Sequence, residues 1–533
     1  MPMESASVSA STTMLLLIVA TGMKLLLFPS YHSTDFEVHR GWMAITSQLP
    51  LKQWYVDNTT EWTLDYPPFF AWFERLLATG APFFDSAMLR VSAEPYDSAA
   101  TNSYQRLTVM ATDSLLLLGC HVQLAATSHG APTAQHSGAA LTFLNAGLLL
   151  VDHVHFQYNG MLIGLLLLSC GLLVSGRERQ AAVAFAVLLM FKHLFLFAAP
   201  LFFVQLLCRH VLHGQPLTAL ATPAALRRLA TLGALVLAVF AIALGPFVAC
   251  NQLGHVAARL FPFGRGLTHA YWAPNAWALY TFADRLAAAV ASRLLPAGMR
   301  SLLLDSGGAG GAAGGTSGRV GETPMLLLPS AGATTAAALV LLAQMPVLVG
   351  TWRRPQPAAF APAVAFCGLA AFACGYHVHE KAMLPPLLVL TALPPPAQLA
   401  AADLHARTLL MLSAAGHYAL LPLLHQPAEW ALARLVPLAY HCALLLVLRQ
   451  RRGAHAHAHM PSGLRWWESL YIAGLVPLDV FCSFVHPLAL APRMPFLPLM
   501  ATSVYCAIGV LYASGLAYRF WLAMSTASAT KVD

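Results

Sequence analysis

Long apolar runs separated by shorter polar segments recur along the whole chain, and most approach the roughly 20 residues that cross a bilayer. The runs are continuous rather than alternating, which predicts membrane-spanning helices instead of barrel strands. We therefore predict an all-α polytopic membrane protein, with residues 1–533 forming a single membrane domain. About fourteen spans are predicted, at 12–29, 107–126, 138–152, 160–175, 180–190, 193–208, 229–249, 328–350, 357–375, 382–395, 407–424, 430–448, 466–484 and 496–521.

Composition agrees with this pattern. Hydrophobic residues make up 58% of the chain and charged residues only 10%, whereas soluble domains carry about 25% charged residues. The net charge of +8 is attributed to cytoplasmic loops rather than to nucleic-acid binding. The nine cysteines lie mostly in apolar runs and form no CxxC, which predicts small buried side chains rather than a disulfide framework or structural zinc.

The first apolar run, residues 14–28, could be a signal peptide. We interpret it as a retained helix, because no small-residue cleavage site follows it and Lys24 near its end can snorkel to the interface.

Basic residues in short loops set the predicted orientation, because cytoplasmic loops carry an excess of Lys and Arg. Such residues occur around 177–179, 209–228, 353–354 and 449–452. Placing all of them in the cytoplasm puts both termini there as well. The opposite face then carries the segments 30–105, 153–159, 250–327, 376–381 and 485–495. Residues 180–208 are short for the two crossings that this topology needs, with Lys192 and His193 at the turn.

Two segments are interpreted as inserts. The stretch 306–317, inside the large loop 250–327, is rich in Gly, Ala and Ser and is typical of a flexible loop. The predicted cytoplasmic loop 449–465 is basic and contains alternating histidines at 455, 457 and 459. These histidines could bind a metal, but they lie beside the basic cytoplasmic run, far from the acidic residues of the opposite face, so a solvated loop is favoured.

Four polar clusters fall on the face opposite the basic loops. Each alone could be an ordinary polar loop, but all four combine aromatic with ionisable side chains on one side. Together they predict one site at the membrane surface. The residues are Asp35, Glu37, His39, Arg40 and Asp65; Asp152, His153, His155, Gln157 and Asn159; Arg259, Arg265, His269, Tyr271, Trp272, Asn275 and Trp277; and Tyr376, His377, His379, Glu380 and Lys381.

The last cluster contains potential zinc ligands. His377 and His379 are two residues apart, which points their rings away from each other on a helix, and no HExxH pattern is present. Cations and hydrogen-bond donors suit a phosphate group, so we favour phosphate binding over metal binding here.

Several motifs resemble a known family. They are the stretches 33–40, 62–74, 155–160, 259–275 and 377–381, which together resemble the endoplasmic-reticulum glucosyltransferases that use dolichyl-phosphate glucose. The resemblance implies a GT-C membrane fold, an active site facing the lumen, and inverting transfer of glucose to a lipid-linked oligosaccharide. It implies no metal and no cofactor besides the lipid donor. Within the family, residues 69–73 favour the members that add the second glucose, in α-1,3 linkage to Glc1Man9GlcNAc2-diphosphodolichol; the first-glucose members are the alternative.

The resemblance also implies roles for individual residues. Asp35 matches the general base, and Asp65 matches a second acidic position. His377, His379 and Lys381 are the candidates for holding the donor phosphate. The remaining candidates for substrate binding are Glu37, Arg40, His155, Gln157, Asn159, Arg265, His269, Tyr271, Trp272 and Glu380.

Two other function classes are weighed from the residues. A transporter would place ionisable residues inside the spans and show an inverted repeat, and neither is clear. A non-catalytic lipid-binding protein would tolerate loss of Asp35. The triplet Asn58-Thr59-Thr60 is an N-x-T sequon in the first predicted lumenal segment, so Asn58 is a candidate for glycosylation.

Overall fold

The computed structural model describes residues 2–127, 132–269, 273–294, 325–453 and 463–526, and these residues fold into helices and connecting turns without a β-sheet. The all-α prediction is thereby confirmed. Within these ranges, nine helices are long and apolar enough to cross a membrane, and two shorter apolar helices, Met14–Leu26 and Asn159–Val174, accompany them. All fourteen predicted ranges overlap helical segments. The number of true spans stays a prediction, because α8, α17 and α18 are too short or too polar to meet the same criteria.

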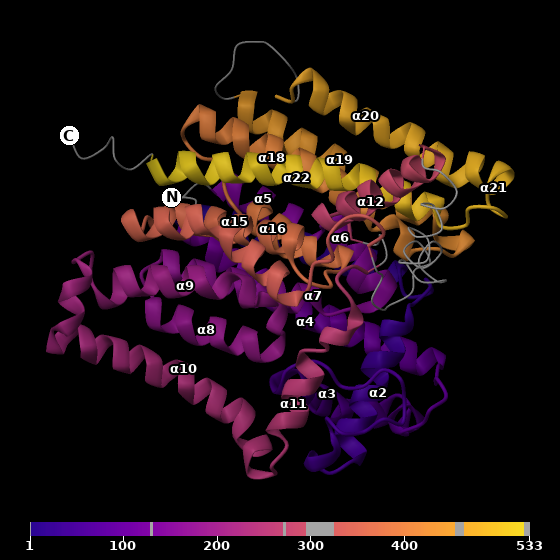
Figure 1. Cartoon of the computed structure of the whole chain (residues 1–533). Coiled ribbons are helices and arrows are strands. Elements are labelled where there is room, and N and C mark those ends of the chain that lie inside the picture. The colour runs from indigo at the N-terminus through magenta and orange to yellow at the C-terminus, as the bar shows by residue number, and fades with distance from the viewer. Residues whose placement is uncertain (1, 128–131, 270–272, 295–324, 454–462, 527–533) are drawn as a thin grey trace.

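The helices form a layered array in which most long helices run in similar directions (Figure 1). Their bounds are α1 (Pro2–Leu26), α4 (Ala99–Thr127), α5 (Pro132–Phe143), α7 (Asn159–Val174), α8 (Glu178–Phe191), α9 (Ala199–Leu206), α10 (Pro223–Ala249), α15 (Ala333–Arg353), α16 (Pro357–Cys374), α17 (Leu384–Thr391), α18 (Leu399–Ala419), α19 (Trp430–Gly453), α20 (Trp466–Val480), α21 (His486–Ala489) and α22 (Leu497–Thr526).

Helices α4 and α7 approach each other closely at their glycines. A Cβ added to Gly119 would collide with the Gly164 carbonyl oxygen, and one added to Gly164 would collide with the Leu115 carbonyl oxygen. Gly160 and Gly164 are four residues apart, the small-residue spacing that allows membrane helices to approach closely. This contact fixes the start of α7, which directly follows the polar segment 153–159.

Lys24 does not snorkel, so that prediction is wrong. Its ammonium lies 2.6 Å from Asp113 Oδ2 on α4, and the two side chains are 4% and 3% exposed. The same carboxylate oxygen lies 2.9 Å from His153 Nε2. The lysine turns inward because it finds a buried carboxylate within reach. Ionisable residues are therefore present among the packed helices, paired with one another as charges in an apolar setting require.

The segments predicted to lie between spans on the opposite face contain helices of their own. They are α2 (Thr34–Gln48), α3 (Pro68–Gly80), α11 (Leu253–Leu260) and α12 (Ala276–Leu294). Ser33 caps the start of α2, and Pro68 begins α3 at a position where proline costs no hydrogen bond. His39 of α2 lies 2.7 Å from Glu74 of α3, with both side chains buried. Figure 1 shows α2 and α3 side by side at the lower right, next to α11.

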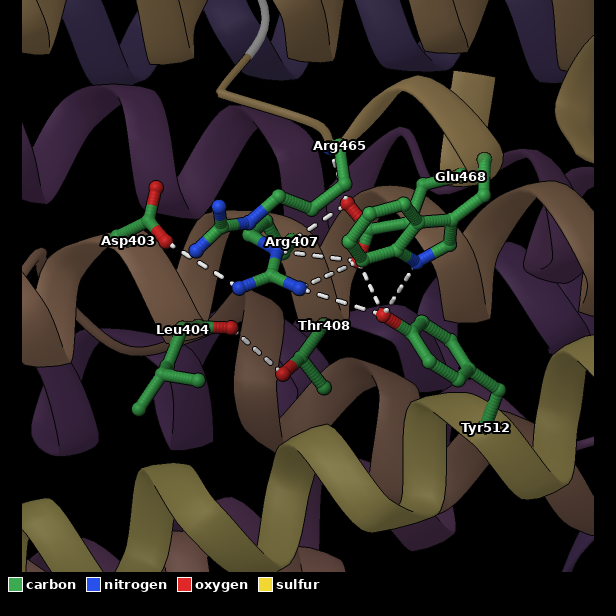
Figure 2. A network of polar contacts seen from close by, with 8 residues as sticks. Asp403, Leu404, Arg407, Thr408, Arg465, Glu468 and Tyr512 are labelled. Atoms are coloured by element: carbon green, nitrogen blue, oxygen red, sulfur yellow. Dashed lines mark hydrogen bonds and ion pairs between the residues drawn. The ribbon is translucent and has the colours of Figure 1, made fainter. Parts of the chain in front are cut away.

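A buried polar network fastens α20 to α18 and α22. Figure 2 shows the Arg407 guanidinium between Asp403 and Glu468, with the Tyr512 hydroxyl facing the Glu468 carboxylate. Arg407 donates to both oxygens of Glu468 at 2.7–3.1 Å, and Tyr512 donates to Glu468 at 2.7 Å. Glu468 also accepts from the backbone N–H of Arg465. Arg465, at the end of the predicted loop 449–465, is thus fixed to α20. The histidines 455–459 of this loop and the Gly-rich stretch 306–317 lie outside the described residues.

Candidate active site

Three donors meet on one oxygen of Asp35. The Lys381 ammonium and the Gln157 amide each donate to Asp35 Oδ2 at 2.6 Å, and His155 Nε2 lies 3.2 Å from the same atom. No hydrogen bond to Oδ1 is found in the part of the chain that the structure describes. The Asp35 side chain is 24% exposed. One oxygen is thus held in place while the other can accept a proton from a bound hydroxyl.

Local structure explains how Asp35 reaches this position. Asp35 lies in the first turn of α2, where the helix N-terminus favours a negative charge. Ser33 accepts from the Asp35 backbone N–H and donates its hydroxyl hydrogen to the His155 carbonyl at 2.6 Å. The start of α2 is therefore tied directly to the segment that carries His155 and Gln157.

That segment is conformationally unusual. Residues Leu149–Phe156 form a π-helical stretch, and Phe156 has a φ of 86°, a region that a bulky residue rarely adopts. The strained residue redirects the chain so that His155 and Gln157 both face Asp35. Such strain occurs mainly at functional sites, where the surrounding packing holds it; Phe156 is fully buried.

Lys381 belongs to a second segment, which pairs with the loop before α12. The His377 N–H donates to the Leu267 carbonyl at 2.9 Å, and Thr268 forms an isolated bridge with Val378. His377 Nδ1 lies 3.1 Å from the Gly266 carbonyl oxygen, which can only accept, so Nδ1 carries the hydrogen. His377 itself has a φ of 50°, a second strained position in this region.

Three histidine rings lie together beside Lys381. The ring centres of His269 and His379 are 4.7 Å apart, and that of His377 is 5.5 Å from His269 and 5.4 Å from His379. Burial, together with neighbouring histidines and Lys381, lowers the pKa of His269 to about 4 and that of His379 well below its usual range. Burial also lowers the pKa of His377. The three imidazoles are therefore neutral at pH 7. The single N–H of His377 is donated to Gly266, so His269 and His379 are the rings whose N–H groups can be donated to an oxyanion.

Asp65 is paired with a different cation. Arg265 donates to Asp65 Oδ2 at 3.0 Å. Burial raises the pKa of Asp65, although Arg265 opposes the shift. Next to it, the Lys192 ammonium lies 4.7 Å from the centre of the Tyr66 ring. The structure thus places two carboxylates and three cations around one region.

Lys381 and His155 determine the protonation state of Asp35. Burial disfavours the ionised form, but Lys381 and His155 outweigh it and hold the pKa of Asp35 well below its usual range. Conversely, burial disfavours the charge on Lys381, but Asp35 and Glu380 outweigh it and raise the pKa of Lys381. Asp35 is therefore ionised at physiological pH, as a general base must be.

Four other predicted site residues do not contact Asp35 through their side chains. Glu37 and Arg40 bind each other at 2.5–2.9 Å, and Arg40 also donates to the Met88 and Arg90 carbonyls, so the structure does not bring them to Asp35. Asn159 donates to Asp152 at 2.8 Å beside the start of α7. Glu380 is buried next to Lys381, and burial raises its pKa.

Three predictions remain: the roles of Tyr271 and Trp272, the glycosylation of Asn58, and the absence of a metal. Tyr271 and Trp272 lie outside the described residues. Asn58 is exposed, and its side-chain oxygen accepts a hydrogen bond from Arg259. No group of three or more His, Cys, Asp or Glu side chains that could hold a metal ion occurs among the residues that the structure describes; metal independence stays a prediction.

Sequence reasoning missed Lys192 and Ser33 as members of this region. Lys192 separates two apolar runs, α8 and the 3-10 segment His193–Ala198, in an extended conformation. It was interpreted only as a turn residue. A lysine enclosed by apolar runs was nevertheless a usable signal, because such a charge needs a polar partner.

The arrangement contains the parts needed to transfer a group from an anionic leaving group. Asp35 supplies a carboxylate with one open oxygen, and cations and neutral imidazoles lie beside it. Comparison with known proteins gives the family. A model of the ALG6, ALG8 glycosyltransferase family matches residues 20–517. The chain belongs to this family.

Relatives within the family are similar over nearly their full length. A protein of Drosophila melanogaster named probable dolichyl pyrophosphate Glc1Man9GlcNAc2 alpha-1,3-glucosyltransferase is 44% identical, over 95% of this chain and 94% of its own. Proteins with the same name without "probable" are 41% identical in Bos taurus, over 92% of each chain, and 40% identical in Arabidopsis thaliana, over 93% of this chain and 95% of theirs.

Proposed function

We propose that this protein is the α-1,3-glucosyltransferase that adds the second glucose to the lipid-linked oligosaccharide. The donor is dolichyl β-D-glucosyl phosphate, and the acceptor is Glc1Man9GlcNAc2-diphosphodolichol. The reaction takes place on the lumenal side of the endoplasmic-reticulum membrane. The names of the relatives, at about 40% identity over more than nine tenths of the chain, support this acceptor. The observation that carries the chemistry is Asp35, with Oδ2 held by three donors and Oδ1 open.

In the proposed mechanism, Asp35 Oδ1 accepts the proton of the acceptor hydroxyl as that oxygen attacks C1 of the donor glucose. The new C1–O bond forms on the face opposite the phosphate, and the bond from C1 to the phosphate oxygen breaks. A β-linked donor therefore yields an α-linked product. The phosphate leaves with its electron pair and needs no proton from the protein. Lys381 and Gln157 hold the base in position, and general bases of this kind contribute about 10²–10⁴-fold in rate.

The leaving group needs compensation for charge, because a phosphodiester becomes a dianion when the sugar departs. Preorganised donors aimed at developing charge are a large contribution to catalysis. His379 is proposed to donate its N–H group to the phosphate, with Lys381 bridging between the phosphate and Asp35. His377, whose N–H is donated to the Gly266 carbonyl, is proposed to hold this segment in place. Asp65, held by Arg265, is proposed to bind acceptor hydroxyls.

A defined-acceptor assay tests the proposal. Purified protein in lipid nanodiscs is given dolichyl phosphate carrying radiolabelled glucose and diphosphodolichol oligosaccharides with no, one or two glucose residues. We expect transfer to the acceptor with one glucose and an α-1,3 linkage in the product. Transfer chiefly to the acceptor without glucose would make it the first-glucose enzyme instead. No transfer to any acceptor would refute the proposed activity.

A further inference from the structure

Lys192 lies between α8 and the 3-10 segment His193–Ala198. Its side chain lies near Asp35, Asp65 and Lys381. Its backbone N–H donates to the Leu188 carbonyl and completes α8. Its ammonium stands over the Tyr66 ring at 4.7 Å, adjacent to Asp65. The charges of Lys381, Asp35, Asp152 and Asp65 all act on it, in that order of strength after burial.

The other two cations of this region already have carboxylate partners. Lys381 lies 2.6 Å from Asp35, and Arg265 lies 3.0 Å from Asp65. By contrast, the Lys192 ammonium makes neither a hydrogen bond nor an ion pair with any described residue. An aromatic face stabilises a cation only partly, by about 0.5–2 kcal/mol. Lys192 is therefore the cation here whose charge is compensated least.

Such an arrangement favours an anionic ligand. Burial and the nearby Lys381 lower the pKa of Lys192 to about 8, which shows that its surroundings disfavour the charge. A bound anion would supply the missing counter-charge and restore full protonation. In the proposed reaction the anion could come from the donor phosphate or from the diphosphate of the acceptor.

The proposed reaction separates these two sources. Asp35 must lie next to the acceptor's terminal glucose, and the diphosphate of that acceptor is at the far end of the oligosaccharide. The donor phosphate, in contrast, is bonded to the same C1 that the acceptor oxygen attacks. Only the donor phosphate must therefore lie beside Asp35.

We propose that Lys192, held over the ring of Tyr66, binds the phosphate of the dolichyl-phosphate sugar donor and stabilises the charge that develops as this phosphate leaves. Lys381 is then chiefly the residue that positions Asp35. This assignment rests on the proposed function, since it takes the identity of the donor from it.

The test compares Lys192→Met and Lys192→Arg with the wild-type protein in nanodiscs. The matched control is Lys52→Met, the same substitution at an exposed lysine in the Leu51–Gln53 segment. We expect Lys192→Met to lower kcat/KM for the donor by about 100-fold or more, the usual effect of removing one oxyanion donor, while the KM for the acceptor stays unchanged. Binding of dolichyl phosphate, followed as thermal stabilisation of the protein, should weaken in parallel. Lys52→Met should match wild type in each measurement.

The pH dependence provides an independent readout. The wild-type kcat/KM for the donor should fall as the pH rises through about 8, because Lys192 loses its proton in the free enzyme. Lys192→Arg should remove this loss, since a guanidinium stays charged. This readout remains decisive even if Lys192→Met folds poorly.

The outcomes separate the two proposals. A wild-type protein that transfers glucose to no acceptor refutes the proposed function. An active wild type with Lys192→Met equal to Lys52→Met, or with only the acceptor KM raised, overturns the role of Lys192 alone. An alkaline decline that persists in Lys192→Arg overturns it as well.

Discussion

Replacing Asp35 by Asn separates its charge from its shape. The amide keeps an oxygen that can accept from Lys381, Gln157 or His155, but it can no longer take a proton from the acceptor hydroxyl. Loss of a general base costs about 10²–10⁴-fold in rate, which corresponds to about 3–5 kcal/mol in the activation barrier. We expect glucose transfer by Asp35→Asn to fall by at least that factor.

The effect on folding should be smaller than the effect on rate. The Asp35 and Lys381 side chains are 24% and 17% exposed, so their ion pair is neither fully buried nor on the surface. Exposed pairs contribute about 0–1 kcal/mol, whereas breaking a buried pair costs about 3–5 kcal/mol. We therefore expect a loss of about 1–2 kcal/mol in folding free energy, which leaves the protein folded.

The assay is single-turnover transfer of radiolabelled glucose at saturating donor, with thermal unfolding measured on the same samples. Asp97→Asn is the matched control, because Asp97 lies in the same predicted lumenal segment and its side chain is 56% exposed. The control should keep wild-type turnover. Turnover by Asp35→Asn within a few-fold of wild type would remove Asp35 from the mechanism.

Three further predictions concern Lys381, the Arg407 network and Asn58. Lys381→Ala removes the cation that lowers the pKa of the base, so the acidic decline of kcat/KM should move to higher pH; an unchanged acidic limb and unchanged kcat/KM would exclude any role of Lys381 in catalysis. Glu468→Ala leaves the buried Arg407 without its carboxylate and should destabilise the fold by about 3–5 kcal/mol in detergent unfolding, whereas Asp403→Ala, at a partly exposed carboxylate, should cost about 1 kcal/mol or less. Asn58 should carry a glycan in eukaryotic cells, seen as a glycosidase-sensitive mass that Asn58→Gln abolishes; labelling that places residues 50–60 in the cytosol would contradict the orientation.

The sequence predicted the helical class and the segments that meet at Asp35, for identifiable reasons. Spanning helices are visible as apolar runs because the bilayer requires them. The polar clusters around Asp35, His155 and Lys381 stood out because the rest of the chain is apolar. Their one-sided distribution followed from the positions of the basic loops.

Other features depend on tertiary contacts that sequence patterns do not display. Helices α2 and α3 were not identified from the sequence because they lack long apolar runs. They are stabilised by packed aromatic rings such as Trp42, Tyr66 and Phe70. Lys24 was expected at the interface because its partner Asp113 is distant in sequence. The apolar runs on both sides of Lys192 indicated a charge that needs a polar partner, but its proximity to Lys381 and Asp65 is visible only in the fold.

The most direct test of the proposed function is the lipid-linked oligosaccharide that accumulates in cells lacking this protein. We expect accumulation of the species with one glucose, Glc1Man9GlcNAc2-diphosphodolichol, reversed by the wild-type protein and not by Asp35→Asn. Accumulation of the species without glucose, or with two glucoses, would contradict it.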